Sequence, residues 1–255
     1  MSPSPLVRRL AVIPARLGST RLPRKVLLRE SGKYLFQHVV ERVAAARCFD
    51  AVILATDAEE IAEAARSVGI ESRMTSPDLA SGTDRVRAVV GSIPTAEIIL
   101  NVQGDEPELE PGDLARLVEA LEKGREPVVT LATPLRAGED PSDPNGVKVV
   151  ASAEGRALYF SRAPIPYLRG SGRRLRHLGV YGFLREALEG FSAWPRSPLE
   201  EAEGLEQLRF LEHGIPVRVL LTDASPRGID TRADYDRFLA RLQAAEGSQW
   251  RSTSS

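Results

Sequence analysis

The chain has 255 residues, 42% of them hydrophobic, with 34 basic and 35 acidic side chains. This length accommodates one large α/β domain, and the balanced charge argues against a nucleic-acid-binding protein, which usually carries a basic excess. No apolar run approaches the roughly 20 residues that cross a bilayer, and the first residues contain no secretory signal. The single Cys48 fits a reducing compartment. We expect a cytoplasmic protein whose partners are neither nucleic acid nor membrane.

Short apolar runs alternate with amphipathic segments along the chain. Strands are predicted at 10–14, 51–55, 98–102, 128–132, 147–152, 157–161, 178–183 and 217–222, and helices at 35–47, 58–68, 84–91, 114–123, 185–193, 200–213 and 232–244. The strand–helix alternation of the first half predicts a mostly parallel sheet with helices on both faces. The closely spaced strands of the second half predict an antiparallel insertion. We therefore expect one α/β domain over 1–245 and a disordered tail over 246–255.

The segment 10–25 holds the most informative pattern. Its apolar run stops at Pro14 and leads into a small-residue turn at 18–20, flanked by the cations Arg16, Arg21 and Lys25. A buried strand that leads into a basic, glycine-bearing loop is typical of polyphosphate binding, because backbone N–H groups and cationic side chains face the anion. The spacing matches neither the P-loop nor the dinucleotide-binding fingerprint.

Two acidic turns are candidate metal sites. Asp105 follows an apolar strand and a glycine, where a carboxylate can hold Mg²⁺ together with substrate phosphates. The alternative is a turn that leads into a helix, with Asp105 or Glu106 solvated. Asp230 precedes an amphipathic helix, and the alternative there is an N-cap at Asp230 or Thr231 with Asp234 in a capping box. If Thr231 is the cap, Asp230 remains available as a second ligand.

Other polar segments suggest a nucleoside and a polyhydroxylated acid. The turn at 81–85 can contact a base or a ribose, or it can simply cap a helix through Thr83 or Asp84. Arg can bind a carboxylate, and Gln, Glu and His can bind hydroxyl groups. The residues considered for these roles are Arg162, His177, Glu206 and Gln207. No serine nucleophile elbow, H-E-x-x-H motif or cysteine pair is present, which disfavours hydrolase triads and zinc catalysis.

Nine segments, taken together and in order, resemble the 3-deoxy-manno-octulosonate cytidylyltransferase (CMP-Kdo synthetase) family of Gram-negative bacteria. They are IPARLGSTRLPRK at 13–25, ATD at 55–57, SGTDR at 81–85, NVQGDEP at 101–107, PNGVKVV at 144–150, ALYFSR at 157–162, RHLGVYG at 176–182, LEQLR at 205–209 and GIDT at 228–231. The resemblance covers roughly residues 8–242. Each motif alone is weak, but their number and order make the resemblance specific.

The resemblance implies a Rossmann-like nucleotidyltransferase fold, a homodimer, and a sugar-binding and dimerisation subregion at about 134–215. The implied reaction is CTP plus Kdo to CMP-Kdo and pyrophosphate, which activates Kdo for lipopolysaccharide synthesis. Arg21 and Lys25 would be catalytic with the Mg²⁺ ligands Asp105 and Asp230. CTP would be bound by Pro14, Ala15, Arg16, Ser81, Gly82, Arg85 and Gln103, and the sugar acid by Arg162, His177, Glu206 and Gln207.

The chain departs from the family pattern at two positions. Arg24 replaces a common glycine in the basic loop, so the loop takes another shape or Arg24 adds a phosphate contact. Gly146 replaces a common alanine, a small change. Two other functions remain possible at this stage: a CMP-sugar synthetase for sialic acid or 8-amino-Kdo, and a non-catalytic nucleotide sensor. Retention of Lys25 and both aspartates argues against the sensor.

Overall fold

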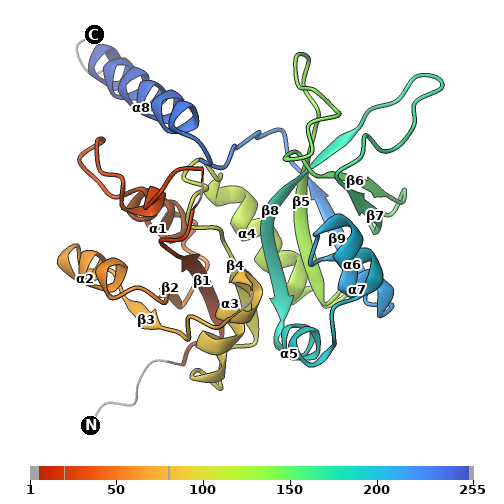
Figure 1. Ribbon diagram of the computed structural model, residues 1–255, viewed down its shortest axis with the longest axis horizontal. Coiled ribbons are helices and arrows are strands. Elements are labelled where there is room, and N and C mark those ends of the chain that lie inside the picture. The colour runs from red at the N-terminus through yellow and green to blue at the C-terminus, as the bar shows by residue number, and fades with distance from the viewer. Residues whose placement is uncertain (1–5, 20, 80, 253–255) are drawn as a thin grey trace.

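The computed structural model describes residues 6–19, 21–79 and 81–252, with the backbone alone for 246–252. Thr20, in the turn that the sequence predicted, lies outside these residues. A nine-stranded sheet runs through the molecule in the order β3-β2-β1-β4-β8-β5-β9, with β6 pairing with β7 and β8 (Figure 1). The strands are β1 (Arg9–Ala15), β2 (Ala51–Thr56), β3 (Ser72–Met74), β4 (Ile98–Asn101), β5 (Val128–Pro134), β6 (Lys148–Ala151), β7 (Ala157–Ser161), β8 (Leu175–Leu184) and β9 (Val217–Leu221).

The sheet is mostly parallel, as the sequence predicted. β1 pairs in parallel with β2 and β4, β2 with β3, and β5 with β9. β8 is antiparallel to both β4 and β5, between which it lies. Because of this reversal, the beginning of β8 lies beside the carboxyl ends of its neighbours, and this is the edge at which open parallel sheets bind ligands. β6 and β7 form the predicted antiparallel insertion.

Helices cover both faces of the sheet, and each face has its own core. Alternate residues of β1 point to opposite faces: Leu10 and Val12 pack with helices α3, α5 and α7, while Ala11 and Ile13 pack with α1, α2 and α4. β1 is apolar from Leu10 to Ala15 because both of its faces are buried. The helices are α1 (Leu35–Ala45), α2 (Glu59–Ser67), α3 (Gly82–Gly91), α4 (Pro111–Glu122), α5 (Arg185–Ala193), α6 (Pro198–Glu203) and α7 (Leu208–Glu212).

The last helix, α8 (Arg232–Ser252), crosses back to the N-terminal half of the molecule. Tyr235 and Phe238 pack there against Leu22 and Leu35, in a third apolar cluster that includes Ile229. α8 continues beyond residue 244, where the sequence predicted its end. It therefore includes the first part of the segment expected to be disordered, while 253–255 lie outside the described residues. No helix among the described residues is long and apolar enough to span a membrane.

Three elements differ from the sequence prediction. The edge strand β3 was not predicted because its three residues, Ser72–Met74, are largely exposed and mostly polar. The short 3-10 helix η1 (Lys25–Leu27) follows the basic loop and was also missed. The single helix predicted over 200–213 is two helices, α6 and α7. Gly204, with φ 62°, takes a left-handed conformation that ends α6.

Candidate active site

The basic loop after β1 returns its last cation to the edge of the sheet. The loop ends at Arg24, which has φ 58° and ψ 24°, and η1 begins at Lys25. The left-handed conformation that glycine would adopt easily is therefore adopted by arginine here. The Arg24 guanidinium pairs with Glu60 on α2 and lines a different surface cavity. Lys25, by contrast, points back toward the sheet.

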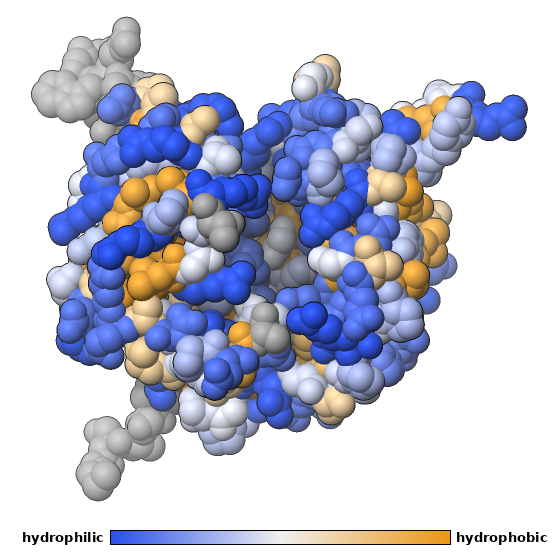
Figure 2. Space-filling view, in the orientation of Figure 1, coloured by the Kyte–Doolittle hydropathy of each residue, from blue (hydrophilic) through white to orange (hydrophobic). Residues whose placement is uncertain are grey.

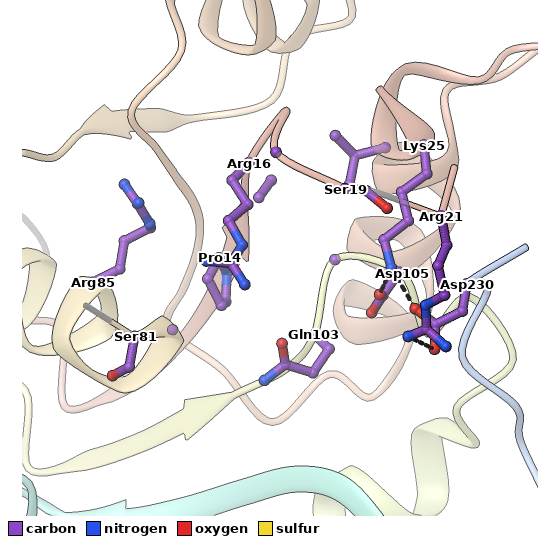
Figure 3. Close-up of a pocket in the computed structure, with 15 residues that line it drawn as sticks. Pro14, Arg16, Ser19, Arg21, Lys25, Ser81, Arg85, Gln103, Asp105 and Asp230 are labelled. Carbon is purple, nitrogen blue, oxygen red and sulfur yellow. Dashed lines mark hydrogen bonds and ion pairs between the residues drawn. The ribbon is translucent and has the colours of Figure 1, made fainter. Parts of the chain in front are cut away.

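Lys25 joins the two candidate metal ligands. Its Nζ pairs with Asp105 Oδ2 and lies 2.9 Å from Asp230 Oδ1, and Arg21 Nη2 lies 2.9 Å from Asp230 Oδ2 (Figure 3). Arg21 Nη1 also donates to Asn145 Oδ1 at 3.3 Å. Burial alone would lower the pKa of Lys25, but the two carboxylates outweigh burial and raise it above its ordinary value. Two cations and two carboxylates from distant parts of the chain thus form one charged cluster.

The local structure around Asp230 leaves its carboxylate free for this contact. Thr231 Oγ1 donates to Asp234 Oδ2 at 2.7 Å, and the Asp234 amide donates to Thr231 Oγ1 at 3.2 Å, so these two residues cap α8 between them. The Ile229 amide donates to the Asp105 carbonyl at 2.9 Å. This backbone bond fixes the 228–231 turn beside the turn that follows β4.

The residues opposite this charged cluster could hold a nucleoside. Ser81 is the N-cap of α3, with its hydroxyl accepting from the Asp84 amide at 3.1 Å, so the cap is neither Thr83 nor Asp84. Arg85 is 3% exposed, and its guanidinium donates to Asp57 at 2.7 Å and to Thr75. Gln103 lies between this group and the Lys25 group (Figure 3).

One cavity, which we call the first cavity, brings together every residue predicted for catalysis or CTP binding. Figure 2 shows a hollow in this face of the molecule, surrounded largely by hydrophilic surface. The predicted residues that line the cavity are Pro14, Ala15, Arg16, Arg21, Lys25, Ser81, Gly82, Arg85, Gln103, Asp105 and Asp230. Gly104 belongs there too, because a Cβ on it would lie 2.9 Å from the Pro14 carbonyl oxygen. The close approach of the β1 and β4 ends therefore requires glycine at 104.

A second cavity adjoins the first and shares Arg16, Gly82 and Gln103 with it. Three of the four predicted sugar-binding residues line this second cavity: His177, Glu206 and Gln207. Tyr181 and Asn101, to which the sequence analysis assigned no role, line it as well. The Tyr181 hydroxyl and Asn101 Oδ1 are buried and have no hydrogen-bond partner within the described part of the chain. Such buried, unpaired polar atoms are costly, and they suit a polar ligand that pairs with them.

Arg162 is the exception among the predicted sugar-binding residues, because its guanidinium lines neither cavity. It donates to three backbone carbonyls: Glu203 at 2.8 Å, Pro144 at 2.7 Å and Gly204 at 3.3 Å. These bonds use three of the five guanidinium N–H donors, one from each nitrogen. The structure therefore gives Arg162 the role of joining the end of β7 to the end of α6.

Burial shifts the pKa values of two groups near the site: Glu106, which follows Asp105 in the chain, and His177, which lines the second cavity. Burial, and next to it the Asp105 carboxylate, raise the pKa of Glu106 to about 8, so this carboxyl adds little negative charge at neutral pH. Burial, assisted by Arg176, lowers the pKa of His177 to about 3. The His177 imidazole is therefore neutral, and its Nε2 lies 2.9 Å from Thr130 Oγ1. A neutral imidazole suits hydrogen bonding to hydroxyl groups rather than ion pairing.

The arrangement is typical of a nucleotidyltransferase: cations and carboxylates gather at the carboxyl edge of a parallel sheet, in one cavity that adjoins a second cavity with polar lining residues. A family model described as cytidylyltransferase matches residues 10–219. The 3-deoxy-manno-octulosonate cytidylyltransferase of Acidobacterium capsulatum is 47% identical over 228 residues, covering 88% of this chain and 92% of the relative. That of Syntrophotalea carbinolica is 45% identical, covering 91% and 98%.

Solved structures agree with these relatives. A CMP:2-keto-3-deoxy-manno-octonic acid synthetase complexed with CTP superposes with a TM-score of 0.88 at 40% identity, covering 94% of this chain and 99% of that one. The 4-diphosphocytidyl-2C-methyl-D-erythritol synthase of Anaerococcus prevotii shares the fold, with a TM-score of 0.62 at 14% identity, covering 92% and 99%. This chain belongs to the 3-deoxy-manno-octulosonate cytidylyltransferase family, and it is a nucleotidyltransferase enzyme.

Proposed function

We propose that this chain transfers CMP from CTP to Kdo with the aid of Mg²⁺, releasing pyrophosphate and activating Kdo for lipopolysaccharide synthesis. The observation that carries the proposal is the meeting of Asp105, Asp230 and Lys25 at one end of the first cavity. Carboxylates for a cation and a lysine for phosphates are the groups that phosphoryl transfer requires. Family membership supplies the two substrates.

The first cavity would bind CTP. Arg16, Arg21 and Lys25 offer positive charge for the triphosphate at one end. The cytidine would lie at the other end, against Pro14 and Ala15 and within reach of Ser81, Gly82, Arg85 and Gln103. Because Arg85 is already held by Asp57, it offers a fixed donor and loses little freedom when a base binds.

Asp105 and Asp230 fit a Mg²⁺ ion. Each places a carboxylate oxygen on the same lysine nitrogen, so the two oxygens can reach a single small cation. No cluster of three or more potential metal-ligating side chains exists within the described residues. A site with two carboxylates suits an ion whose other ligands are phosphate oxygens and water. Bound there, Mg²⁺ would neutralise charge on the phosphates of CTP.

The second cavity would bind the sugar acid. Neutral His177 and the amide of Gln207 can pair with hydroxyl groups, and so can Glu206. The unpaired atoms of Tyr181 and Asn101 add two further positions for hydrogen bonds. His177, Tyr181, Glu206 and Gln207 fall within the subregion of about 134–215, which we propose as the sugar-binding part of the domain.

The reaction requires no nucleophile from the protein. The anomeric hydroxyl oxygen of Kdo would form a bond to the α-phosphorus of CTP as the bond to the β-phosphate oxygen breaks, with net loss of the hydroxyl proton. Holding the sugar in the second cavity against the nucleotide in the first places the two reactants for in-line attack. Lys25 and Arg21 would stabilise the negative charge that builds up on the departing pyrophosphate.

Product analysis tests the proposal directly. The enzyme is incubated with CTP, Mg²⁺ and Kdo, and CMP-Kdo and pyrophosphate are quantified, with UTP and ATP as nucleotide controls. A panel that adds sialic acid and 8-amino-Kdo separates Kdo from related sugar acids. CMP-Kdo as the preferred product supports the proposal. CTP binding without turnover on any sugar would instead identify a nucleotide sensor.

We further propose a homodimer that acts in the cytoplasm. The support for a dimer is the family resemblance, and for the cytoplasm it is the single Cys48, which is partly buried and whose pKa burial raises. Light scattering of the purified protein measures the oligomeric state. A monomeric mass at the concentrations used for activity would contradict the dimer.

A further inference from the structure

The Lys25 side chain lies where two carboxylates need a cation. Its Nζ contacts Asp105 Oδ2 and, at 2.9 Å, Asp230 Oδ1. The lysine side chain is only 13% exposed, whereas the aspartate side chains are 24% and 39% exposed. An ammonium group that bridges two carboxylates in a partly buried place satisfies both of them. The carboxylate pair that we assign to Mg²⁺ therefore already has cationic partners within the chain.

We infer that Lys25 is the cation that occupies this site before CTP and the metal bind. When CTP binds, Lys25 moves from the two carboxylates to the triphosphate, and the metal takes its place. This inference rests on the proposed function, because it uses the same two aspartates and the same substrate. It predicts a binding order: the divalent cation binds together with CTP, and the site holds the cation only weakly when CTP is absent.

Competition for the same oxygens is the physical basis. A divalent ion on Asp105 and Asp230 would have to displace the ammonium, which would then be left without a partner in a partly buried place, at a cost in free energy. Once CTP is present, its phosphates accept the lysine, and that cost disappears. The flexible four-carbon side chain of lysine permits such a move. Arg21, whose ion pair is with Asp230 and not with Asp105, can remain in contact with Asp230 throughout.

Mn²⁺ binding to the full chain, measured by electron paramagnetic resonance with and without CTP, tests the exchange without any turnover. Wild type is expected to bind Mn²⁺ weakly alone and more tightly when CTP is present. Lys25→Met is expected to bind Mn²⁺ alone about tenfold more tightly than wild type does, because an unpaired buried charge is no longer created. Lys25→Gln provides the same comparison if Lys25→Met is poorly folded.

Arg16→Met is the matched control for charge. Arg16 lines the same cavity, and among the described residues it forms no ion pair with either aspartate. Its loss removes one positive charge without vacating the position between the carboxylates, so Mn²⁺ affinity is expected to rise less than about threefold. The double variant Lys25→Met/Asp105→Asn is expected to lose the gain, which locates the ion.

Unchanged Mn²⁺ affinity in both Lys25 variants overturns the inference. An equal gain in Mn²⁺ affinity in Arg16→Met overturns it too. That result would show that metal binding is suppressed by the positive charge of the cavity as a whole and not by Lys25 between the two carboxylates. These results are independent of the proposed function, which fails instead if wild type makes no CMP-Kdo. An enzyme that makes CMP-Kdo but shows no lysine effect on Mn²⁺ binding would retain the function and lose the exchange.

Discussion

Arg85 Nη2 donates to Asp57 Oδ2 at 2.7 Å, and this bond joins α3 to the end of β2 beneath the first cavity. The Arg85 side chain is 4% exposed and that of Asp57 is 21% exposed, so the pair is largely removed from water. Thr75, after β3, accepts a second bond from the same guanidinium. Arg85 is thus fixed before any ligand arrives, and Asp57 is the residue that fixes it.

We predict that Asp57→Asn raises the KM for CTP about tenfold or more with a smaller change in kcat. The buried guanidinium would lose its charged partner, which both displaces it and destabilises the fold by about 3 kcal/mol. Steady-state kinetics and thermal unfolding measure the two effects. Glu71→Gln removes an exposed carboxylate that pairs with Arg73 and should change neither. An unaltered KM would show that Arg85 needs no partner.

Asp105→Ala and Asp230→Asn are each expected to reduce turnover at least about a hundredfold at saturating Mg²⁺, because each removes a carboxylate ligand for the ion. Pyrophosphate release is the measurement. Lys25→Ala should lower turnover far more than it weakens binding of the sugar acid, since its partner would be the triphosphate. Near-normal rates in Asp105→Ala would rule out a metal role for Asp105. Equal losses of turnover and of sugar binding in Lys25→Ala would rule out a phosphate role for Lys25.

Tyr181→Phe is expected to weaken sugar binding, whereas Arg162→Met is expected to destabilise the fold. Removing the unpaired Tyr181 hydroxyl should raise the KM for Kdo up to about tenfold, since one neutral hydrogen bond to substrate is lost, and it should not lower the melting temperature, since the hydroxyl has no partner in the described chain. Arg162→Met should lower the melting temperature, because three carbonyls lose their donors. A rise in the KM for Kdo in Arg162→Met at unchanged stability would assign this arginine to the sugar acid.

Gly104→Ala is expected to destabilise the fold by about 1–3 kcal/mol and to remove most activity. The added methyl would press on the Pro14 carbonyl and displace the neighbouring Asp105. Gly112→Ala is the matched control, because a Cβ there meets no atom within 4 Å and the residue lies in α4. It should stabilise the protein by up to about 1 kcal/mol. Equal stability of the two variants would contradict the close approach.

His177 should make the free energy of unfolding depend on pH in the acidic range. Its pKa is about 3 in the folded chain and 6.5 in the reference state, so the unfolded chain binds the extra proton between these values. Its contribution is therefore complete above about pH 6.5 and is lost as the pH falls toward 3, by up to about 1.4 kcal/mol per pH unit. Urea unfolding of wild type and His177→Gln over this range measures the difference. Parallel curves would show that the pKa of His177 is the same in the folded and the unfolded chain.

The sequence predicted the sheet and the residues that line the first cavity because their signals are local. Apolar runs mark the strands of the parallel sheet, Asp105 lies in the turn after β4, and Lys25 and Ser81 lie at helix starts. What it could not predict depends on contacts between distant segments. Arg162 looks like a carboxylate ligand until its carbonyl partners are known. That the Tyr181 hydroxyl is buried and lacks a hydrogen-bond partner in the described chain can be seen only from the residues packed around it.

Likewise, a backbone with positive φ cannot be inferred from an arginine. Position 24 differs from the family's usual glycine, yet Arg24 takes a left-handed conformation and its side chain is directed to Glu60. The Arg24 side chain therefore adds no contact inside the first cavity. In β3, three mostly polar residues at an edge carry no periodic signal that could distinguish a strand from a loop.

The return of the chain from β9 to α8 determines when the enzyme can become active during its synthesis. The five strands from β1 to β5, together with Lys25 and Asp105, leave the ribosome long before Asp230, which lies 205 residues after Lys25. Until the 228–231 turn emerges and bonds to the Asp105 carbonyl, the site has only one of its two carboxylates. With Asp230 in the metal site that we propose, a nascent chain can fold much of its sheet before it can become active, and translation must pass the 228–231 turn before CTP can be consumed.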